Sequence, residues 1–399
     1  MNSERQIRST SLARRVFLIA TEESGDRLGA GLMKVLRQRF GDAVQFDGVG
    51  GRAMAREGLT SLFPIEELSI VGFTAVVVQL PKILQLIRLT VDAVMETSPD
   101  ILVIIDSPDF THRVARRVRS RNPSIPIVDY VSPSVWAWRP GRARSMRRYV
   151  DHVLALLPFE PAAYERLRGP ACSYVGHPLT EQLASLRPNA EEQARRDAEP
   201  AVLLVLPGSR RGEIRHHMAV FGEALARLQG AGIACEVVLP TMPHLVDAVR
   251  AGVKSWPLEP RIAIGETEKR SAFRIARAAL SKSGTVTLEL ALSGVPMVAA
   301  YRAGAVEAWI ARRVIDVHSV ILANLVLGEN VVPEYLQENC TGEKLSGALR
   351  DVLLETASRR RQLEAFAGID RIMSTGNVAP SVRAADIVLA AMRSRSRRS

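Results

Sequence analysis

The stretch Ile101-Leu102-Val103-Ile104-Ile105, followed directly by Asp106-Ser107-Pro108-Asp109, indicates the fold class. Five consecutive apolar residues predict a strand buried on both faces, as in a parallel sheet. Proline and aspartate end this strand, and a helix follows in which Phe110, Val114 and Val118 recur at four-residue spacing. A strand, a polar loop and a helix in this order are typical of an α/β protein.

The same order recurs in both halves of the chain. The first half adds the apolar runs Val16–Ala20, Ile125–Val131 and Val153–Leu157, with a helix expected over about Leu28–Phe40. The second half has the runs Val202–Leu206, Ala234–Leu239, Ala278–Leu280 and Met297–Tyr301. The polar segment Glu181–Pro200 lies between the two series and predicts a linker. We therefore predict an α/β protein with two Rossmann-like parallel-sheet domains facing a cleft.

Length and composition agree with a two-domain globular protein. The chain has 399 residues, of which 47% are hydrophobic and 24% charged, and it exceeds the usual size of one domain. These proportions exclude a disordered chain, a collagen-like repeat and a small disulfide scaffold. Cys172, Cys235 and Cys340 lie far apart and form no CxxC pair. We expect a reduced cytoplasmic compartment, with neither a zinc site nor a disulfide framework.

The chain is basic, and the position of the charge bears on its partners. The formal net charge is +11, of which residues 1–15 carry +3 and the tail from Arg393 carries +4. Arginine clusters at residues 113–121 and 139–148 lie in the first half. A basic face suits nucleic acid or anionic lipid headgroups. No nucleic-acid motif accompanies it and aromatic residues are only 5%, so side chains that stack on bases are scarce.

We expect neither a signal peptide nor a membrane-spanning helix. The N-terminus is polar and basic, and the apolar run Val16–Ala20 is short. The longest apolar stretch, Ile70–Ile87, is interrupted by Gln79, Pro81, Lys82 and Gln85, which argues against a span. It is either a helix packed into the core or an amphipathic segment that lies on a membrane surface.

Two loops in the second half suit a phosphate. Ser283-Gly284-Thr285 precedes a helix, where glycine permits close backbone approach and the helix N-terminus favours an anion. Glu289, four residues on, shares the face of Thr285 and suits a ribose hydroxyl. Pro207-Gly208-Ser209-Arg210 repeats this arrangement, with a guanidinium for a diphosphate. The alternatives are a capped helix and a tight turn, but the two loops together favour a nucleotide.

Two familiar nucleotide motifs are missing. No GxxxxGK[ST] loop occurs in the sequence. Gly48-Val49-Gly50-Gly51 has the glycines of a dinucleotide loop, but the pattern predicts no strand before it. No DxD pair occurs either, so we expect no metal-bridged diphosphate and no metal ligands.

Acidic residues follow two of the strands expected in the first half. Asp106 and Asp109 leave one strand end, Asp100 precedes the same strand, and each is a candidate general base. The alternative is that Asp106 or Asp109 caps the helix near Phe110. The other polar loop holds Glu22, Ser24 and Asp26, where Ser24 or Asp26 is a candidate helix cap.

Two further polar residues have mainly structural interpretations. Asn324 follows a mixed apolar stretch in the second half, where an amide suits a base or a phosphate, although a lone asparagine is usually a turn residue. His177, in Gly176-His177-Pro178, fits a turn better than catalysis.

These motifs, in this order, resemble lipid-A-disaccharide synthases, which are inverting glycosyltransferases of family 19 with the GT-B architecture of two Rossmann-like domains. The resemblance runs from about Val16 to Gln337. Thr21 stands where the family commonly has glycine, and Ala323 where proline often precedes the asparagine. The residues that carry the resemblance are Glu22–Asp26 with Leu28-Gly29-Ala30, Asp106–Phe110, Tyr130–Trp138, Leu157–Glu160, Val175–Pro178, Leu206–Arg210, Ser283–Thr285 with Leu288-Glu289, Asn324-Leu325, Val332–Glu334 and Leu336-Gln337.

The resemblance implies a reaction. The enzyme would transfer 2,3-diacylglucosamine from its UDP derivative to the 6-hydroxyl of 2,3-diacylglucosamine 1-phosphate, which yields a β-1,6 disaccharide and UDP in lipid A biosynthesis. An acceptor domain would span residues 1–180, with a helix at about 370–399 packing on it, and a UDP-sugar domain would span 200–369. The resemblance implies no cofactor and no metal.

The resemblance also implies roles for single residues. Asp109 would be the general base, although Asp100 and Asp106 stay open as alternatives. Asp100, Glu22, Ser24, Arg210 and Asn324 would also serve catalysis. The UDP-sugar would bind at Gly208, Ser209, Arg210, Ser283, Gly284, Thr285, Glu289, Asn324 and Gln337.

Acylated, anionic substrates imply a cytoplasmic enzyme attached peripherally to the inner membrane at an anionic surface, without nucleic acid as a partner. The family suggests a homodimer that exchanges C-terminal elements.

Two other functions remain as alternatives. A UDP-sugar epimerase would share the fold and the nucleotide site, and a non-catalytic nucleic-acid binder would depend on the basic tails.

Overall fold

The computed structural model describes residues 14–68, 73–304 and 319–396, with the side chains of 73–79 and 394–396 left undescribed. The chain forms two compact units. Unit 1 runs to Pro178 and resumes at Thr375, and unit 2 spans Leu179–Ser374. Each unit contains one sheet, and all strand pairs of the described residues in these two sheets are parallel. The prediction of an α/β fold with two parallel-sheet, Rossmann-like domains is confirmed.

Unit 1 is built on a seven-stranded sheet of order β3-β2-β1-β4-β5-β6-β7. Its strands are β1 (Arg14–Ala20), β2 (Val44–Val49), β3 (Thr60–Ser61), β4 (Ile101–Ile105), β5 (Ile127–Tyr130), β6 (His152–Ala155) and β7 (Ala171–Tyr174). Its helices are α1 (Glu23–Phe40), η1 (Gly41–Ala43), α2 (Arg52–Arg56), η2 (Ile65–Leu68), α3 (Phe73–Thr97), α4 (Pro108–Arg121), α5 (Gly141–Met146), α6 (Glu160–Arg166) and α17 (Pro380–Ser396).

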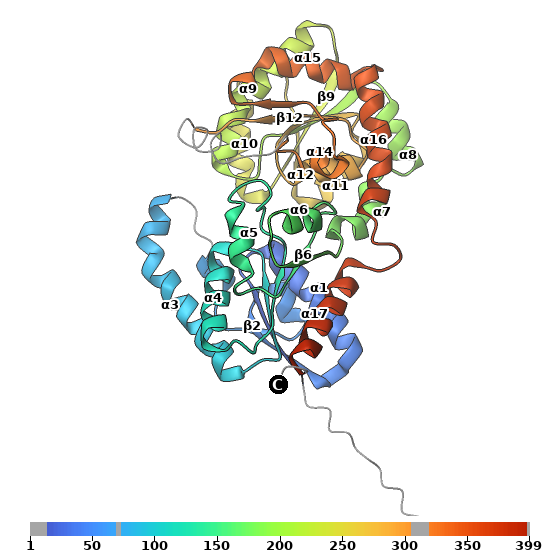
Figure 1. Cartoon of the computed structure of the whole chain (residues 1–399). Coiled ribbons are helices and arrows are strands. Elements are labelled where there is room, and N and C mark those ends of the chain that lie inside the picture. The colour runs from blue at the N-terminus through green and yellow to red at the C-terminus, as the bar shows by residue number, and fades with distance from the viewer. Residues whose placement is uncertain (1–13, 69–72, 305–318, 397–399) are drawn as a thin grey trace, which may run out of the picture. The chain divides into compact units, whose positions relative to one another are not determined.

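Alternate residues of the unit 1 strands pack into two cores. Leu18, Val103 and Ile105 face one core together with residues of α1 and α17. Phe17 and Ile104 face the other core, which α3 and α4 cover. This two-sided burial explains why β4 is apolar at every position. Helix α17, the last part of the chain drawn in red, lies beside α1 (Figure 1).

Unit 2 is built on a six-stranded sheet of order β10-β9-β8-β11-β12-β13, with α9 and α15 packed on one face. Its strands are β8 (Ala201–Leu206), β9 (Cys235–Thr241), β10 (Arg261–Ile264), β11 (Ala278–Lys282), β12 (Met297–Tyr301) and β13 (Glu334–Leu336). Its helices are η3 (Pro178–Gln182), α7 (Leu183–Leu186), α8 (Ala190–Asp197), α9 (Arg211–Gly230), η4 (Pro243–Leu245), α10 (Val246–Val253), α11 (Gly265–Ile275), α12 (Val286–Leu292), α14 (Leu322–Leu327), η5 (Gln337–Asn339), α15 (Gly342–Leu353) and α16 (Ala357–Met373).

The strand order of each sheet reverses direction beside its first strand. In unit 1, β1 lies between β2 and β4, and Ala20 pairs with Ile105. In unit 2, β8 lies between β9 and β11, and Leu206 pairs with Ser281. Ligands of open parallel sheets bind beyond the carboxyl ends of the strands at such a reversal. The loops after β1 and β4, and those after β8 and β11, therefore mark one site in each unit.

The prediction of a linker over Glu181–Pro200 is wrong. The segment contains α7 and α8, and Asn189 with Glu192 forms a complete capping box at the start of α8. Arg196 is buried and donates to the carbonyls of Phe273 and Ser293. A polar side chain of this segment thus has a structural role, because the Arg196 guanidinium satisfies backbone oxygens inside unit 2.

The loop after β1 differs from its prediction. Helix α1 begins at Glu23, before the expected Leu28, and neither Ser24 nor Asp26 is its N-cap residue. The buried Asp26 carboxylate instead accepts from the backbone N–H of Gly51, at 2.7 Å, and of Ala53, at 2.8 Å, at the start of α2. Gly48 and Val49 are the last two residues of β2, a strand that the sequence pattern did not predict.

The apolar stretch 70–87 lies partly outside the residues with described side chains. Within α3, Leu86 and Ile87 are buried, as are Val91 and Val94 one and two turns further on. This part of the helix packs into the core of unit 1. No helix in the described ranges is both long and apolar enough to cross a bilayer.

Candidate active site

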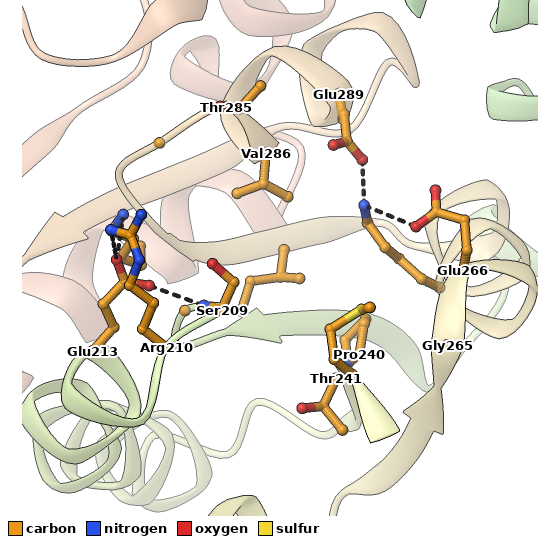
Figure 2. A pocket seen from close by; sticks show the side chains of 16 residues that line it. Ser209, Arg210, Glu213, Pro240, Thr241, Gly265, Glu266, Thr285, Val286 and Glu289 are labelled. Atoms are coloured by element: carbon orange, nitrogen blue, oxygen red, sulfur yellow. Dashed lines mark hydrogen bonds and ion pairs between the residues drawn. The ribbon is translucent and has the colours of Figure 1, made fainter. Parts of the chain in front are cut away.

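A cavity of about 470 Å³ lies at the carboxyl ends of the unit 2 strands. Its volume is within the usual range for small-ligand sites. The predicted residues that line it come from the loops after β8 and β11 and from α12, and they are Gly208, Ser209, Arg210, Gly284, Thr285 and Glu289. Figure 2 shows Ser209 and Arg210 on one loop and Thr285 at the end of the other, with Val286 and Glu289 on α12. The structure therefore brings these predicted residues together.

The loop after β8 is fixed by Glu213 in the first turn of α9. Its carboxylate accepts from the backbone N–H of Ser209 at 2.9 Å. Gly208 has φ +133°, and a Cβ there would lie 2.5 Å from Cβ of Glu213, so only glycine fits. The Arg210 side chain is 81% exposed and approaches Glu213 only to 3.7 Å, which leaves its guanidinium available to a ligand.

A lysine holds Glu289 on the opposite side of the cavity. Nζ of Lys269 lies 2.5 Å from Oε2 of Glu289 and 3.6 Å from Oε2 of Glu266 (Figure 2). Helix α11 supplies Lys269 and Glu266, and α12 supplies Glu289. The Glu289 carboxylate is therefore oriented within the cavity, where it suits a hydroxyl of a bound sugar.

Sequence reasoning missed several residues of this cavity. Lys282, the last residue of β11, lies 3.0 Å from Oε1 of Glu213 through its Nζ. Glu266, Lys269, Thr241 and Met242 also line the cavity. Lys282 immediately precedes the loop Ser283–Thr285, which was predicted to bind phosphate, so a cation at this position is a signal that the sequence contains. Lys269 and Glu266 have no comparable signal, because they become neighbours only through the fold.

Three predicted binding residues lie outside the cavity lining. Asn324 is completely buried, and its amide bonds the backbone of Val331 and Val332 at 2.9–3.1 Å. Ser283 donates to the carbonyl of Val320 at 3.2 Å. Gln337 accepts from the N–H of Ala303 at 3.4 Å. These three side chains hold loops of unit 2 in place, and the structure gives them no contact with the cavity.

In unit 1 the structure brings the two acidic loops together. The Ser107 hydroxyl donates to Oε1 of Glu22 at 3.0 Å, and the Ser24 hydroxyl donates to Oδ2 of Asp106 at 3.3 Å. Asp106 and Ser107 have left-handed φ values of 55° and 45°. Such backbone conformations are strained and cluster at functional sites.

Helix α4 places Asp109 beside an arginine. The Asp109 side chain is 85% exposed, and its Oδ1 lies 3.5 Å from the guanidinium of Arg142. Arg142 also lines a cavity of about 180 Å³ together with Asp106, Val131 and Trp138. Val131 is β-branched yet has φ 89°, a further strained residue in this corner. The predicted cap is not made by a carboxylate, since Ser107 is the N-cap residue of α4.

Asp100 lies apart from the other predicted catalytic residues. It immediately precedes β4, whereas Asp106 follows it. The two residues lie six positions apart along an extended strand, which corresponds to about 20 Å. The Asp100 carboxylate accepts from the backbone N–H of Arg15 at 2.9 Å, at the end of the sheet opposite to the loops that follow β1 and β4. The structure gives Asp100 a role in joining β1 to β4.

Buried polar groups hold the start of α4, the helix that contains Asp109. His112, one turn after Asp109 in α4, lies 3.1 Å from Oδ2 of Asp129 and 3.0 Å from the Tyr149 hydroxyl. Burial raises the pKa of the Asp129 carboxyl, and His112 opposes that effect. The network ties the first turns of α4 to β5 and so restricts the orientation of Asp109.

Glu160 fixes the loop that contains Trp136 and Trp138. Its buried carboxyl accepts from Nε1 of Trp136 at 3.0 Å and from the N–H of Leu157 at 2.9 Å. Burial raises the pKa of Glu160 to about 7, although these hydrogen bonds act in the opposite direction. The wall of the small cavity therefore depends on a carboxyl that titrates near neutral pH.

Comparisons with known proteins identify the family of the chain. The family described as lipid-A-disaccharide synthetase has a model that matches residues 16–378. A lipid-A-disaccharide synthase of Bradyrhizobium diazoefficiens is 75% identical over 380 residues, which cover 95% of this chain and 97% of the relative. One of Rhodospirillum centenum is 43% identical over 376 residues, which cover 94% of each protein.

Solved structures agree on the fold at low sequence identity. The calicheamicin glycosyltransferase CalG4 has a TM-score of 0.59 at 16% identity, covering 95% of this chain and 98% of that one. UDP-GlcNAc 2-epimerase of Neisseria meningitidis, solved with UDP-GlcNAc, has a TM-score of 0.60 at 12% identity, covering 94% and 100%. The fold alone thus fits the epimerase alternative equally well, and the sequence relatives decide between them. The chain belongs to the lipid-A-disaccharide synthase family of glycosyltransferases, which act in lipid A biosynthesis.

Proposed function

We propose that the chain transfers 2,3-diacylglucosamine from its UDP derivative to the 6-hydroxyl of 2,3-diacylglucosamine 1-phosphate with inversion at the anomeric carbon. The products are the β-1,6 disaccharide 1-phosphate and UDP. The observation that carries the proposal is that the family motifs gather at the strand-order reversal of each sheet. Unit 2 would bind the donor, and unit 1 would bind the acceptor.

The unit 2 cavity supports donor binding. The loops after β8 and β11 present backbone N–H groups and small side chains, and Arg210 adds an exposed cation. Helix α9, with 20 residues, begins directly after Arg210, and a helix N-terminus favours phosphate. Glu289, held by Lys269, suits a ribose hydroxyl. The cavity therefore offers separate groups for the phosphates and for the sugar of a nucleotide.

The unit 1 site supports acceptor binding and activation. Asp109 is exposed and lies at the end of a switch-point strand, where a general base needs access to a hydroxyl. Arg142 and Arg139 approach the exposed Trp138 ring to 5.6 and 4.5 Å. Cationic and apolar groups side by side suit a sugar that carries both a phosphate and acyl chains. Asp106, in the same corner, remains the alternative base.

The chemistry is a single displacement. The acceptor 6-oxygen forms a bond to the anomeric carbon while the bond from that carbon to the UDP oxygen breaks. Asp109 takes the hydroxyl proton, and the electron pair of the broken bond goes to the departing diphosphate. Arg210 and backbone N–H groups stabilise the charge that develops there. We infer that transfer requires no metal ion, because protein groups supply this stabilisation.

Peripheral attachment to an anionic membrane surface is part of the proposal. An open hollow is lined by three arginines, Arg144, Arg147 and Arg148, and Leu80 and Leu89 of α3 are 42% and 45% exposed. Some arginines of the cluster at residues 113–121 form ion pairs within the protein, as Arg121 does with Asp92. Flotation with anionic vesicles but not zwitterionic ones is the expected result. The dimer with exchanged C-terminal elements stays a prediction that light scattering tests.

Product analysis tests the proposed reaction. Purified protein is mixed with UDP-2,3-diacylglucosamine and 2,3-diacylglucosamine 1-phosphate in detergent with EDTA. We expect equal amounts of UDP and disaccharide, with a β linkage by NMR. An α linkage would contradict inversion, and loss of turnover in EDTA that Mg²⁺ restores would contradict metal independence. UDP release without disaccharide would contradict transfer to this acceptor.

A further inference from the structure

Lys282 places a cation between the two loops of the unit 2 cavity. It is the last residue of β11, and its side chain is only 18% exposed although it lines the cavity. A Cβ on Gly284 would lie 3.3 Å from Nζ of Lys282. The ammonium group is therefore close to the backbone of the loop that follows β11.

Glu213 connects the same ammonium group to the loop after β8. Its Oε1 lies 3.0 Å from Nζ of Lys282, and its Oε2 accepts from the N–H of Ser209 at 2.9 Å. Nζ also lies 5.5 Å from the centre of the Tyr301 ring. Carboxylate and ring thus fix the ammonium at the point where the two loops meet.

A structural role explains this arrangement poorly. Partly buried ion pairs add little stability compared with apolar side chains of similar size. The Glu213 carboxylate stays ionised, since Lys282 and the Ser209 N–H lower its pKa although burial opposes them. A charged pair kept beside an open cavity is better explained by a ligand of matching charge.

We propose that Lys282 binds the diphosphate of the nucleotide donor through Nζ and stabilises the departing UDP, with Glu213 holding it between the two loops. The proposal rests on the proposed function, which places a UDP-sugar in this cavity. As the bond from the anomeric carbon to oxygen breaks, negative charge grows on the diphosphate, and Lys282 donates a hydrogen bond to it without losing its proton. Arg210 is 81% exposed and closes on the ligand, whereas Lys282 is already in place.

The second lysine of the cavity serves as a matched comparison. Lys269 lies within 3.6 Å of two carboxylates, those of Glu289 and Glu266. Its charge is compensated by both, so its role is to orient Glu289 rather than to attract phosphate. Replacing Lys269 should affect binding of the nucleoside, and replacing Lys282 should affect binding of the phosphates.

Calorimetric titration with uridine, UMP and UDP separates these roles. For Lys282→Met we expect UDP affinity to fall about 10-fold or more, as for loss of a hydrogen bond to a charged group, and uridine affinity to stay within about 2-fold. For Lys269→Met we expect all three ligands to weaken by a similar factor. Retained uridine binding shows that a variant is folded. Equal weakening of all three ligands by Lys282→Met would overturn the proposal, as would unchanged UDP affinity.

Glu213→Gln provides a second test that keeps the lysine charge. If Lys282 binds the diphosphate, this variant loses much less UDP affinity than Lys282→Met, because the ammonium is kept and the amide oxygen of Gln still accepts a hydrogen bond from it. If the ion pair is only structural, Glu213→Gln and Lys282→Met lose UDP affinity alike, which overturns the proposal. Absence of UDP binding by the unchanged protein would overturn the donor site itself, an outcome distinct from a failure at Lys282 alone.

Discussion

The Ser107 hydroxyl donates a hydrogen bond to Oε1 of Glu22 at 3.0 Å, although 85 residues separate the two in the chain. The bond joins the loop after β1 to the loop after β4 at the strand-order reversal of unit 1. Ser107 has φ 45° and immediately precedes Pro108 and Asp109. The position of Asp109 therefore depends on a contact with a loop that lies far away in sequence.

Glu22 variants test whether this contact acts by geometry. Glu22→Ala removes the acceptor, and we expect kcat to fall about 10-fold, by analogy with loss of one charge-assisted hydrogen bond. Glu22→Gln keeps an oxygen that accepts from Ser107, so most of the activity should return. Steady-state kinetics with both substrates is the measurement. Equal losses in the two variants would show that the charge of Glu22, rather than the bond, is required.

Two neighbouring glycines provide a matched pair for the donor loop. Gly208→Ala places a Cβ 2.5 Å from Cβ of Glu213 at φ +133°, which costs about 1–3 kcal/mol or shifts the loop. We expect UDP affinity to fall at least about 10-fold as that loop moves. Gly212→Ala meets nothing within 4 Å in the first turn of α9, so it should retain UDP affinity and gain about 0.5–1 kcal/mol of stability. Similar UDP affinities for both variants would contradict the role of this loop.

Glu160 should make unit 1 less stable as the pH rises towards neutrality. Its pKa is about 7 in the folded protein, against 4.5 as the ordinary value. Between these values the folded state keeps a proton that the unfolded state has lost, so the free energy of unfolding falls by up to about 3 kcal/mol. Glu160→Gln removes this fall. Urea unfolding at pH 5 and pH 7.5 should therefore show a relative gain for the variant at the higher pH.

His177 has the opposite effect over nearly the same range. Burial lowers its pKa to about 4, against 6.5 as the ordinary value. Between these values the unfolded state binds the proton, so the free energy of unfolding rises with pH by up to about 3 kcal/mol. His177→Asn should remove that rise in the same urea experiment, and it serves as the control for Glu160→Gln. Shifts of the same sign in both variants would contradict the assignment.

The sequence predicted the parts of the fold that follow from uninterrupted burial. Ile101–Ile105 is a strand with the expected bounds because both faces of the sheet are covered. The loop Gly208–Arg210, which lines the unit 2 cavity, was singled out because it follows such a strand. In contrast, β10 and β13 were missed, since both are short edge strands whose residues are mostly exposed or partly buried.

The remaining differences concern polar residues whose hydrogen-bonding partners the sequence pattern does not reveal. Asn324 has the side chain of a ligand-binding amide, but its Oδ1 already accepts hydrogen bonds from the backbone N–H groups of Val331 and Val332. The polar residues of α8 suggested a linker, since the sequence does not show that Arg196 donates hydrogen bonds to carbonyls of other elements. Lys282 was passed over because its partner, Glu213, is 69 residues earlier. Only the tertiary structure shows which polar groups are already satisfied.

Asp109 and Asp100 provide the most direct test of the proposed mechanism, as two aspartates at opposite ends of β4. Asp109→Asn and Asp100→Asn are assayed for disaccharide formation, and UDP affinity is measured for each. We expect Asp109→Asn to lose at least about 100-fold in kcat, which is the scale of general base catalysis, with UDP affinity unchanged. Asp100→Asn should keep most of its activity, since an amide oxygen still accepts from Arg15. Full activity in Asp109→Asn, or an equal loss in Asp100→Asn with intact folding, would contradict Asp109 as the base.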